Sequence, residues 1–228
     1  TFVGCSRWLS GRAKKSYLLR GKAVLSIPNP IDTKVYHPMD QGMARELLGL
    51  PSGKRLLLFG ALNVTDKRKG IDYLIEALRR MEKQDVELVV FGQVKDDIRG
   101  LFPVPIHSMG YLSDESKIVA LYNAVDMFIT SSLEENLPNT IMESMACGTP
   151  CVGFEIGGIP EMIDHRVNGY VANYKDAGDL ANGIQWVLEH EDRLALSDAC
   201  VKKVQENYTE EVVAKQYTAL YEKLLKGE

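Results

Sequence analysis

Short apolar runs alternate along the chain with amphipathic stretches of helix length. The apolar runs lie at 55–59, 87–91, near 106, at 126–130 and at 150–154. They are apolar throughout rather than at every second position, which indicates strands buried on both faces of a sheet. Parallel sheets with helices on both sides require this kind of burial. The pattern therefore predicts an α/β fold with a Rossmann-like, doubly wound parallel sheet.

The amphipathic stretches predict the helices of this fold. In the first of them, Leu74, Ile75 and Leu78 follow the three-and-four spacing of a helix face. The predicted helices are 72–83, 114–124, 139–147, 179–189, 192–206 and 210–225. Ligands of open α/β sheets bind beyond the carboxyl ends of the strands. The loops that follow the apolar runs are therefore the candidate site.

One of these loops, in the segment 131–150, continues directly into a helix. Pro138 stands near the helix start, where its missing N–H costs nothing, and Gly148 and Pro150 end the helix. Free backbone N–H groups at the positive end of a helix dipole form an anion site that suits a diphosphate. The turn that offers this site comprises Asn136, Leu137, Pro138, Asn139 and Thr140.

Two carboxylates, Glu135 and Glu143, flank this turn. They would repel a phosphate, but they can accept hydrogen bonds from hydroxyl groups on either side of it, from a sugar and from a ribose. Taken singly, each has an equally good structural interpretation: Glu135 as a solvated loop acid, and Glu143 as an acid favoured near a helix start.

The two glutamates, with seven residues between them and followed by Gly-Thr-Pro at 148–150, resemble the signature of family 4 glycosyltransferases of the GT-B fold. Shorter pieces agree in order: IPNPID at 27–32, with Pro30 in the usual Gly place, KGIDYLI at 69–75, GYL at 110–112 and GGIPE at 157–161. Each short piece is weak alone, but together they cover the chain from about Val24 to the last helices. The resemblance implies that this chain is the C-terminal, nucleotide-sugar-binding half of a GT-B fold.

The resemblance also implies a role for each candidate residue. Glu143 would bind the ribose hydroxyls of the donor, Glu135 would contact the donor sugar, and residues 136–140 would present N–H groups to the diphosphate. Lys69 would neutralise the leaving diphosphate. The implied donor is a UDP- or GDP-linked sugar, and the implied reaction retains the anomeric configuration without a metal or another cofactor.

One departure from the family pattern affects the phosphate site. The family usually has Arg directly after the glycine at the end of the first strand, whereas Ala61 follows Gly60 here. Arg68 or Lys67, beside Lys69, is a candidate replacement. Solvated loop charges are an equally good interpretation of both residues, and without a replacement the affinity for the donor would fall.

Composition and charge narrow the choice of partners. The chain has 228 residues, 45% hydrophobic and 25% charged, an ordinary balance for a globular protein. Its net charge of -4 gives no reason to expect nucleic acid as a partner. The four cysteines lack the paired spacing of a zinc site and favour free thiols in a reducing compartment. No run approaches the ~20 apolar residues of a membrane span.

The predicted organisation is that of a fragment in three parts. Residues 1–23 are interpreted as the end of a linker from a missing N-terminal acceptor domain, 24–206 as the donor-binding domain, and 207–228 as a helix that crosses toward the missing domain. The intact enzyme is expected in the cytoplasm, in polysaccharide or glycoconjugate synthesis. Any peripheral contact with the inner membrane face would belong mostly to the missing domain.

Two other functions are compatible with the same residues, and the sugar, base, acceptor and oligomeric state are open. The fragment alone would be a binding module that holds the donor without turnover. A sugar-nucleotide epimerase or a phosphorylase on the same fold would need extra catalytic acids or a cofactor lysine, and neither is evident. Glycosyl transfer by the intact protein is therefore the leading hypothesis.

Overall fold

The computed structural model describes residues 1–63, 66–81, 85–93 and 99–227. Its centre is a six-stranded parallel sheet with the strand order β5-β4-β3-β6-β7-β8. The strands are β3 (Arg55–Asn63), β4 (Val86–Gln93), β5 (Ile106–Gly110), β6 (Met127–Thr130), β7 (Cys151–Phe154) and β8 (Gly169–Ala172). The order starts in the middle of the sheet and proceeds outward in both directions, as in Rossmann-like folds. The predicted fold class is confirmed.

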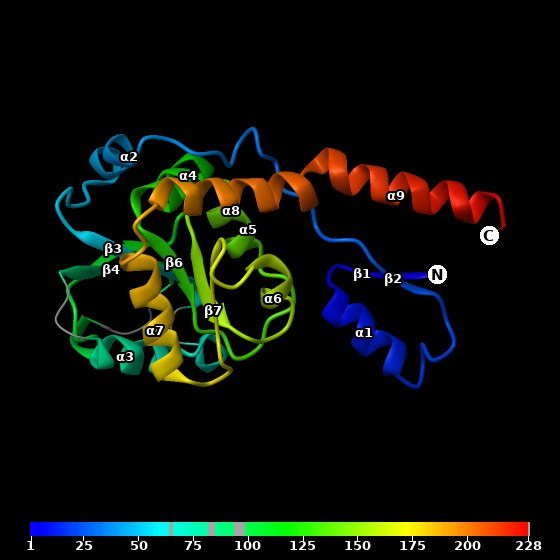
Figure 1. Ribbon diagram of the computed structural model, residues 1–228, viewed down its shortest axis with the longest axis horizontal. Helices are drawn as coiled ribbons and strands as arrows, with labels where there is room; N and C mark the ends of the chain where they lie inside the picture. Colours follow the sequence, from blue (N-terminus) through cyan, green and yellow to red (C-terminus); the bar gives the residue numbers. More distant parts are fainter. Residues whose placement is uncertain (64–65, 82–84, 94–98, 228) are drawn as a thin grey trace.

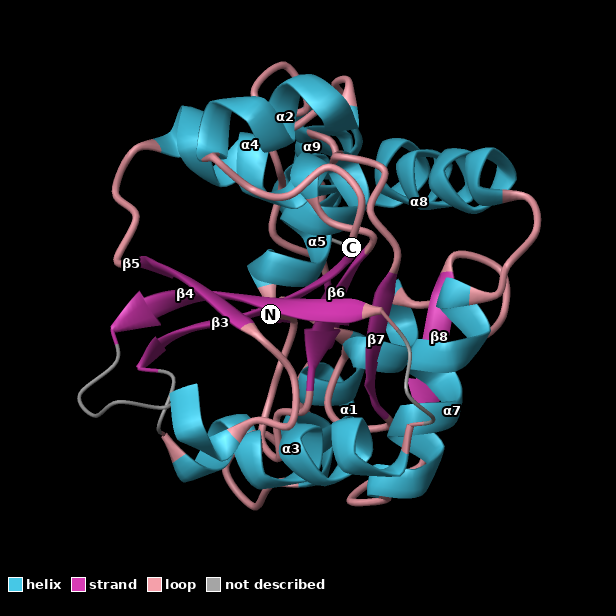
Figure 2. Ribbon diagram, turned by 90° about the vertical axis from the view of Figure 1, so that its left-hand side faces the viewer, coloured by secondary structure: helices cyan, strands magenta, loops and turns pink. Residues whose placement is uncertain are grey.

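Helices cover both faces of this sheet, as Figure 2 shows. One face carries α2 (Gln41–Leu48), α4 (Glu115–Ala124), α5 (Asn139–Ala146) and α8 (Arg193–Asn207), and the other carries α3 (Ile71–Arg80) and α7 (Ala177–Leu188). Three short helices lie in the loops: η1 (Lys67–Lys69), η2 (Arg99–Leu101) and α6 (Ile159–Met162).

The central strand β3 shows why the strand runs are apolar without alternation. Leu56 and Leu58 point into the core under α4 and α5, whereas Leu57 and Phe59 point into the core under α3 and α7. All four side chains are at most 2% exposed. Positions 56–59 of the strand therefore face apolar side chains on both sides, as a sheet covered on both faces requires.

The structure differs from the predicted elements mainly in short ones. Helix α3 ends at Arg80, because Met81 leaves the helical conformation, and residues 82–83 lie outside the described part. Strand β8 and helix α2 were not predicted. Helix α2 has a signal that identifies it, an Asp40 N-cap and a left-handed Gly49 at its end. Strand β8 has only four residues, one of them Gly, and offers no comparable signal.

The two ends of the chain lie side by side at one end of the molecule (Figure 1). Strands β1 (Phe2–Gly4) and β2 (Val24–Ser26) form a two-stranded parallel sheet, with α1 (Arg7–Lys15) between them in sequence. Helix α9 (Glu210–Leu225) packs through Val213 and Leu220 on Ile27. The segment interpreted from sequence as a linker end thus contains a strand and a helix, and its strand pairs with β2.

The four cysteines are free, and Cys147, Cys151 and Cys200 are buried. Burial raises the pKa of Cys147 and of Cys151 to about 12, so these thiols are protonated at neutral pH. Within the described residues, no helix has the length and apolarity needed to cross a membrane.

Candidate functional site

The candidate residues meet where the strand order of the sheet reverses, between β3 and β6. Helix η1 follows β3, and the loop 131–138 follows β6. Ser131 Oγ donates to the carbonyl of Lys69 at 2.9 Å, and the N–H of Leu133 donates to the carbonyl of Arg68 at 2.7 Å. These two bonds hold η1 against the loop after β6 and place the Lys69 side chain beside Glu135.

Close contact between the two loops depends on Gly70. This residue has a left-handed conformation, with φ of +63°, and a Cβ there would lie 2.0 Å from the carbonyl oxygen of Ser131. Any side chain would push the loops apart, so glycine is required on both counts.

Lys69 and Glu135 form an ion pair at this junction. Lys69 Nζ lies 2.5 Å from Glu135 Oε1, and the two side chains are 32% and 15% exposed. Both residues were predicted from sequence as ligand contacts, and the structure brings them together. Their direct pairing was not predicted.

The two candidate replacements for the absent arginine differ in their surroundings. Arg68 folds back on Asp66, with Nη2 2.7 Å from Oδ2, and its guanidinium holds the pKa of Asp66 at about 2. Lys67 is exposed and makes no ion pair with a described residue. The side chain of Ala61 lies outside the described part. Gly60 has a packing role, because a Cβ there would lie 1.9 Å from the Phe91 ring.

The start of α5 lacks the side-chain cap that most helices of this chain have. Its N-cap is Pro138, which makes no capping hydrogen bond, and its first turn contains no acidic residue. In contrast, Asp114, Asp176 and Asp192 cap α4, α7 and α8 through their side chains.

The backbone donors at this helix start are unused. Among the described residues, none accepts a hydrogen bond from the N–H groups of Asn136, Leu137, Asn139 and Thr140. Pro138 contributes no N–H, and the Leu137 side chain is buried. The turn therefore presents orphan donors at the positive end of a helix, where they suit an anion.

Glu143 lies one turn further along α5 and is partly buried. Tyr122 Oη donates to its Oε2 at 2.8 Å. Burial raises the pKa of Glu143, the nearby carboxylate of Glu115 raises it further, and the hydrogen bond from Tyr122 lowers it. Burial raises the pKa of Tyr36, and the nearby charges of Glu143 and Glu115 raise it further.

Sequence reasoning missed Tyr122, Tyr36 and Glu115. They come from α4 and from the segment before α2, far from Glu143 in sequence, and no local pattern connects them to it. No group of three or more His, Cys, Asp or Glu residues suited to a metal ion occurs within the described residues.

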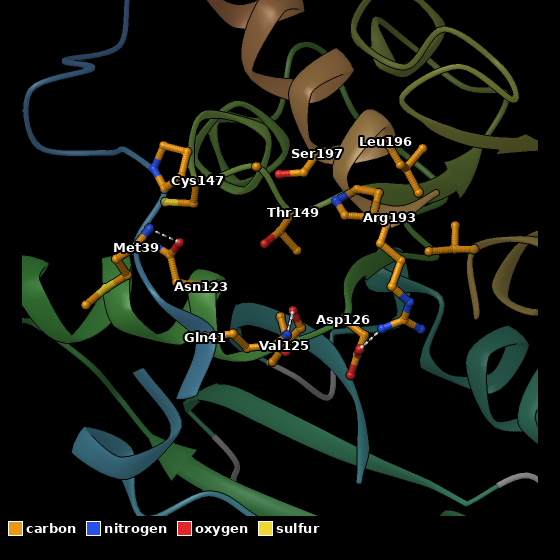
Figure 3. A pocket seen from close by; sticks show the side chains of 14 residues that line it. Met39, Gln41, Asn123, Val125, Asp126, Cys147, Thr149, Arg193, Leu196 and Ser197 are labelled. Carbon is orange, nitrogen blue, oxygen red and sulfur yellow. Dashed lines mark hydrogen bonds and ion pairs between the residues drawn. The ribbon is translucent and has the colours of Figure 1, made fainter. Parts of the chain in front are cut away.

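A separate pocket lies at the opposite edge of the sheet (Figure 3). Its lining includes Asp126, which precedes β6, and Thr149, which precedes β7. Arg193 Nη1 lies 2.7 Å from Asp126 Oδ1 at its rim. The amino ends of the strands form this pocket, so it is distinct from the junction of Lys69 and Glu135.

Comparison with known proteins agrees with this geometry. The family model for glycosyl transferases group 1 matches residues 53–190, more than half of the chain. N-acetyl-alpha-D-glucosaminyl L-malate synthase of Bacillus anthracis is 24% identical over 213 residues, which cover 91% of this chain and 55% of that protein.

Two solved structures have a similar fold. One is the C-terminal domain of a glycosyl transferase group 1 family protein from Francisella tularensis, with a TM-score of 0.66, 21% identity, and coverage of 79% of this chain and 99% of that one. The other is Anabaena HepE in complex with UDP-glucose, with a TM-score of 0.78 and 19% identity. Its match covers 96% of this chain and 63% of HepE, so this chain spans little more than half of the longer proteins that it matches. The chain belongs to the group 1 glycosyltransferases, known as family 4, and forms the C-terminal, Rossmann-like half of their GT-B fold.

Proposed function

We propose that this chain binds a nucleoside diphosphate sugar at the junction of β3 and β6 and supplies the donor half of a retaining glycosyltransferase. The observation that carries the proposal is the convergence of Lys69, Glu135 and the uncapped start of α5 where the strand order reverses. Membership of the glycosyltransferase family supports this choice of ligand.

Each part of a diphosphate sugar has a matching group in this arrangement. The orphan N–H groups at 136–140 and the Lys69 ammonium would hold the diphosphate and the charge that it gains as it leaves. When the donor binds, the Glu135 carboxylate would accept hydrogen bonds from hydroxyl groups of the sugar, and its contact with Lys69 would weaken. The leaving phosphate would take up the proton of the acceptor on the same face of the sugar, which retains the anomeric configuration.

The carboxylate of Glu143 would bind the two ribose hydroxyls. A carboxylate accepts from both hydroxyls of a vicinal diol, and the hydrogen bond from Tyr122 fixes its orientation. We propose uridine as the base, supported by the UDP-glucose complex of HepE, which has the same fold.

Lys67 is the better substitute for the absent arginine. Arg68 is committed to Asp66, whereas Lys67 is exposed on the same short helix and has no ion partner among the described residues. Lys67 could therefore bind a phosphate without breaking an existing ion pair, whereas Arg68 would have to leave Asp66. Lys67→Ala should therefore weaken binding of UDP more than Arg68→Ala does.

Catalysis would need a second half that binds the acceptor. We propose that the 228-residue chain alone binds the donor without turnover, and that the whole enzyme acts in the cytoplasm in polysaccharide or glycoconjugate synthesis. The basic segment 7–22 supports a peripheral contact with an anionic membrane surface. It contains six cationic residues and no acidic one, and Tyr17 and Leu18 are 92% and 83% exposed.

Thermal unfolding with a panel of nucleotides tests the proposal. UDP-sugars at about a hundred times their dissociation constant should stabilise the chain by roughly 2.7 kcal/mol, a rise in Tm of several degrees. GDP- and ADP-sugars serve as base controls, and Glu143→Ala should abolish the rise. A chain that no nucleoside diphosphate or its sugar stabilises would contradict the proposal.

A further inference from the structure

The N-terminal segment makes a specific contact with the proposed donor loop through Ser6. This residue is 1% exposed and caps α1, where its Oγ accepts from the N–H of Leu9 at 2.9 Å. The same Oγ donates to Asn136 Oδ1 at 2.6 Å, and Asn136 Nδ2 lies 2.9 Å from Cys5 Sγ. Both ends of the Asn136 amide are thus engaged by residues 5–6, more than 100 positions away in sequence.

Glu161 of α6 makes a second contact with the same segment. Its two carboxylate oxygens accept from the N–H groups of Arg7 and Trp8, at 2.9 and 2.7 Å. Helix α1 has no acidic residue in its own first turn, so Glu161 supplies the negative charge that favours a helix start. The Glu161 side chain is 18% exposed, whereas that of Arg7 is 77% exposed.

The loop that leads to Glu161 packs against the same turn. The N–H of Gly158 donates to the carbonyl of Asn136 at 2.5 Å. A Cβ on Gly157 would lie 2.0 Å from the carbonyl oxygen of Glu135, and one on Gly158 would lie 2.4 Å from that of Asn136. Residues 5–8, the turn at 135–136 and the loop 157–161 therefore form one closely packed junction.

We propose that Ser6 and Glu161 are positioning residues for the donor site, holding Asn136 and through it the backbone of Glu135. The Asn136 side chain is fully used in this junction and acts as a support rather than a ligand contact. A displacement of the β1–α1–β2 unit, which lies outside the main sheet in Figure 1, would change the placement of the Glu135 carboxylate. The expected effect on ligand binding rests on the proposed function. The coupling of residues 5–8 to the turn at 135–136 does not, because it follows from the contacts of the junction.

Hydrogen–deuterium exchange of the ligand-free, 228-residue chain tests the coupling. Ser6→Ala and Glu161→Gln should each speed exchange of the Gly158 N–H, which donates to the carbonyl of Asn136, by about fivefold, the factor that corresponds to losing a hydrogen bond of about 1 kcal/mol. Thr209→Ala is the matched control, because it removes a side-chain cap from α9 without touching the junction. Unchanged exchange of the Gly158 N–H in both variants would overturn the inference.

Two further measurements separate positioning from general destabilisation. The affinity for UDP-glucose should fall about tenfold in Ser6→Ala and Glu161→Gln, with a smaller loss for UDP, because Glu135 is placed at the sugar and Glu143 at the ribose. Equal losses for the two ligands would refute the positioning role. Glu161→Ala removes both acceptors, so it should speed exchange and weaken binding of UDP-glucose more than Glu161→Gln does. If the unmodified chain binds neither ligand, the proposed function fails, whereas the exchange data still decide the coupling.

Discussion

Glu143 combines a proposed role in ligand binding with a cost to the stability of the folded chain. Burial and the nearby Glu115 both disfavour its ionised form, and the hydrogen bond from Tyr122 offsets only part of this effect. Its pKa in the folded chain therefore lies above the value of about 4.3 that an unfolded chain shows. A ribose diol would supply two donors to this carboxylate and relieve the cost on binding.

The pH dependence of stability follows from the sign of this shift. As pH rises past about 4.3, Glu143 ionises first in the unfolded chain, so the folded state loses stability until pH exceeds the raised pKa. Glu143→Gln cannot ionise and keeps an acceptor for Tyr122. It should raise the Tm of the ligand-free chain at pH 7, by about 2–4 °C per kcal/mol gained, with no gain near pH 4.

Thermal scans between pH 4 and pH 8 check this expectation, with Glu222→Gln on the exposed part of α9 as the control. A Glu143→Gln chain that is less stable than the unmodified chain at pH 7 would contradict it. The same variant should lose affinity for UDP, which would separate the cost of this carboxylate from its function.

Substitutions in the ion pair of Lys69 and Glu135 can likewise separate an effect on stability from an effect on UDP binding. Lys69→Met removes the charge proposed for the diphosphate and leaves a mostly buried carboxylate without its partner. It should lower the free energy of unfolding by about 1–3 kcal/mol and weaken binding of UDP by roughly 10–100-fold.

The double variant Lys69→Met/Glu135→Gln distinguishes the two effects. It should recover most of the lost stability, because no unpaired charge is left, but none of the lost affinity for UDP. Lys215→Met on α9 controls for the loss of one exposed lysine. Urea unfolding and calorimetric titration with UDP measure the two quantities, and recovery of UDP affinity in the double variant would refute the role of Lys69.

Individual site residues were predictable from sequence only where a local pattern exposed them. Glu135 and Glu143 stand out because they flank a turn before a helix, and Lys69 because it follows a strand. Tyr122 and Ser6 approach the same turn from distant segments, and their contacts depend on tertiary packing. The roles of the predicted residues in ligand binding await the binding experiments.

At the scale of elements, the helix starts divide into two groups. Among the described residues, six α-helices have a side-chain cap, from Ser6, Asp40, Asp114, Asp176, Asp192 and Thr209, and Asp66 caps the short helix η1. Helices α3, α5 and α6 have none; α5 and α6 follow the carboxyl ends of β6 and β7, and α3 follows η1. The capped helices α4 and α7 follow β5 and β8, the two outer strands of the sheet. An internal cap would occupy the N–H groups that a diphosphate needs, so its absence at the start of α5 fits the proposed function.

Gly70 offers a test of how closely η1 and the loop after β6 must approach. Gly49 has almost the same conformation, with φ of +64°, but a Cβ there would meet nothing within 4 Å. Gly49→Ala should cost only the left-handed penalty of about 1–2 kcal/mol. Gly70→Ala should cost roughly 2 kcal/mol more, because its Cβ would meet the carbonyl of Ser131.

Urea unfolding of the two variants compares these costs directly. Gly70→Ala should also weaken UDP binding, since separation of the loops displaces Lys69, whereas Gly49→Ala should not. Equal losses of stability would show that the loops can separate without penalty.

Element prediction succeeded for the long helices and for strands in continuous apolar runs, and it missed α1, α2 and the short strands at the ends of the chain and the edge of the sheet. The helix at 210–225 has sixteen residues, and its predicted and observed bounds agree. Strands β1, β2 and β8 have three or four residues each, too few for a periodic signal. Strands β6 and β7 are as short, but they lie in the apolar runs 126–130 and 150–154. The pairing of β1, β2 and β8 with neighbouring strands, rather than their own sequence, makes them strands.

At the scale of the whole molecule, the carboxyl and amino edges of the sheet carry different groups of polar residues. The carboxyl edge carries the proposed donor site, and the amino edge carries a charge cluster around Asp126, which is 4% exposed. Arg45, Arg55 and Arg193 all pair with this carboxylate, and the N–H of Leu56 donates to it. The cluster joins α2, β3 and α8 on the side away from Lys69 and Glu135.

The distance between the edges predicts that stability and binding respond to different substitutions. The four residues of β6 span roughly 13 Å, beyond the range within which substitutions usually interact. Asp126→Asn leaves the buried guanidinium of Arg45 without its counter-charge and should cost about 3–5 kcal/mol. Arg55→Gln removes only a half-exposed partner at 3.4 Å and should cost at most about 1 kcal/mol.

Both variants should retain the affinity of the unmodified chain for UDP at temperatures well below their unfolding transitions. The expected pattern is thus opposite to that of Lys69→Met/Glu135→Gln, which keeps most of its stability and loses binding. Urea unfolding with calorimetric titration at 10 °C would reveal it. A loss of UDP affinity in Asp126→Asn comparable to its loss of stability would mean that the sheet transmits strain from one edge to the other, and that the donor site depends on the whole domain rather than on the loops at its carboxyl edge.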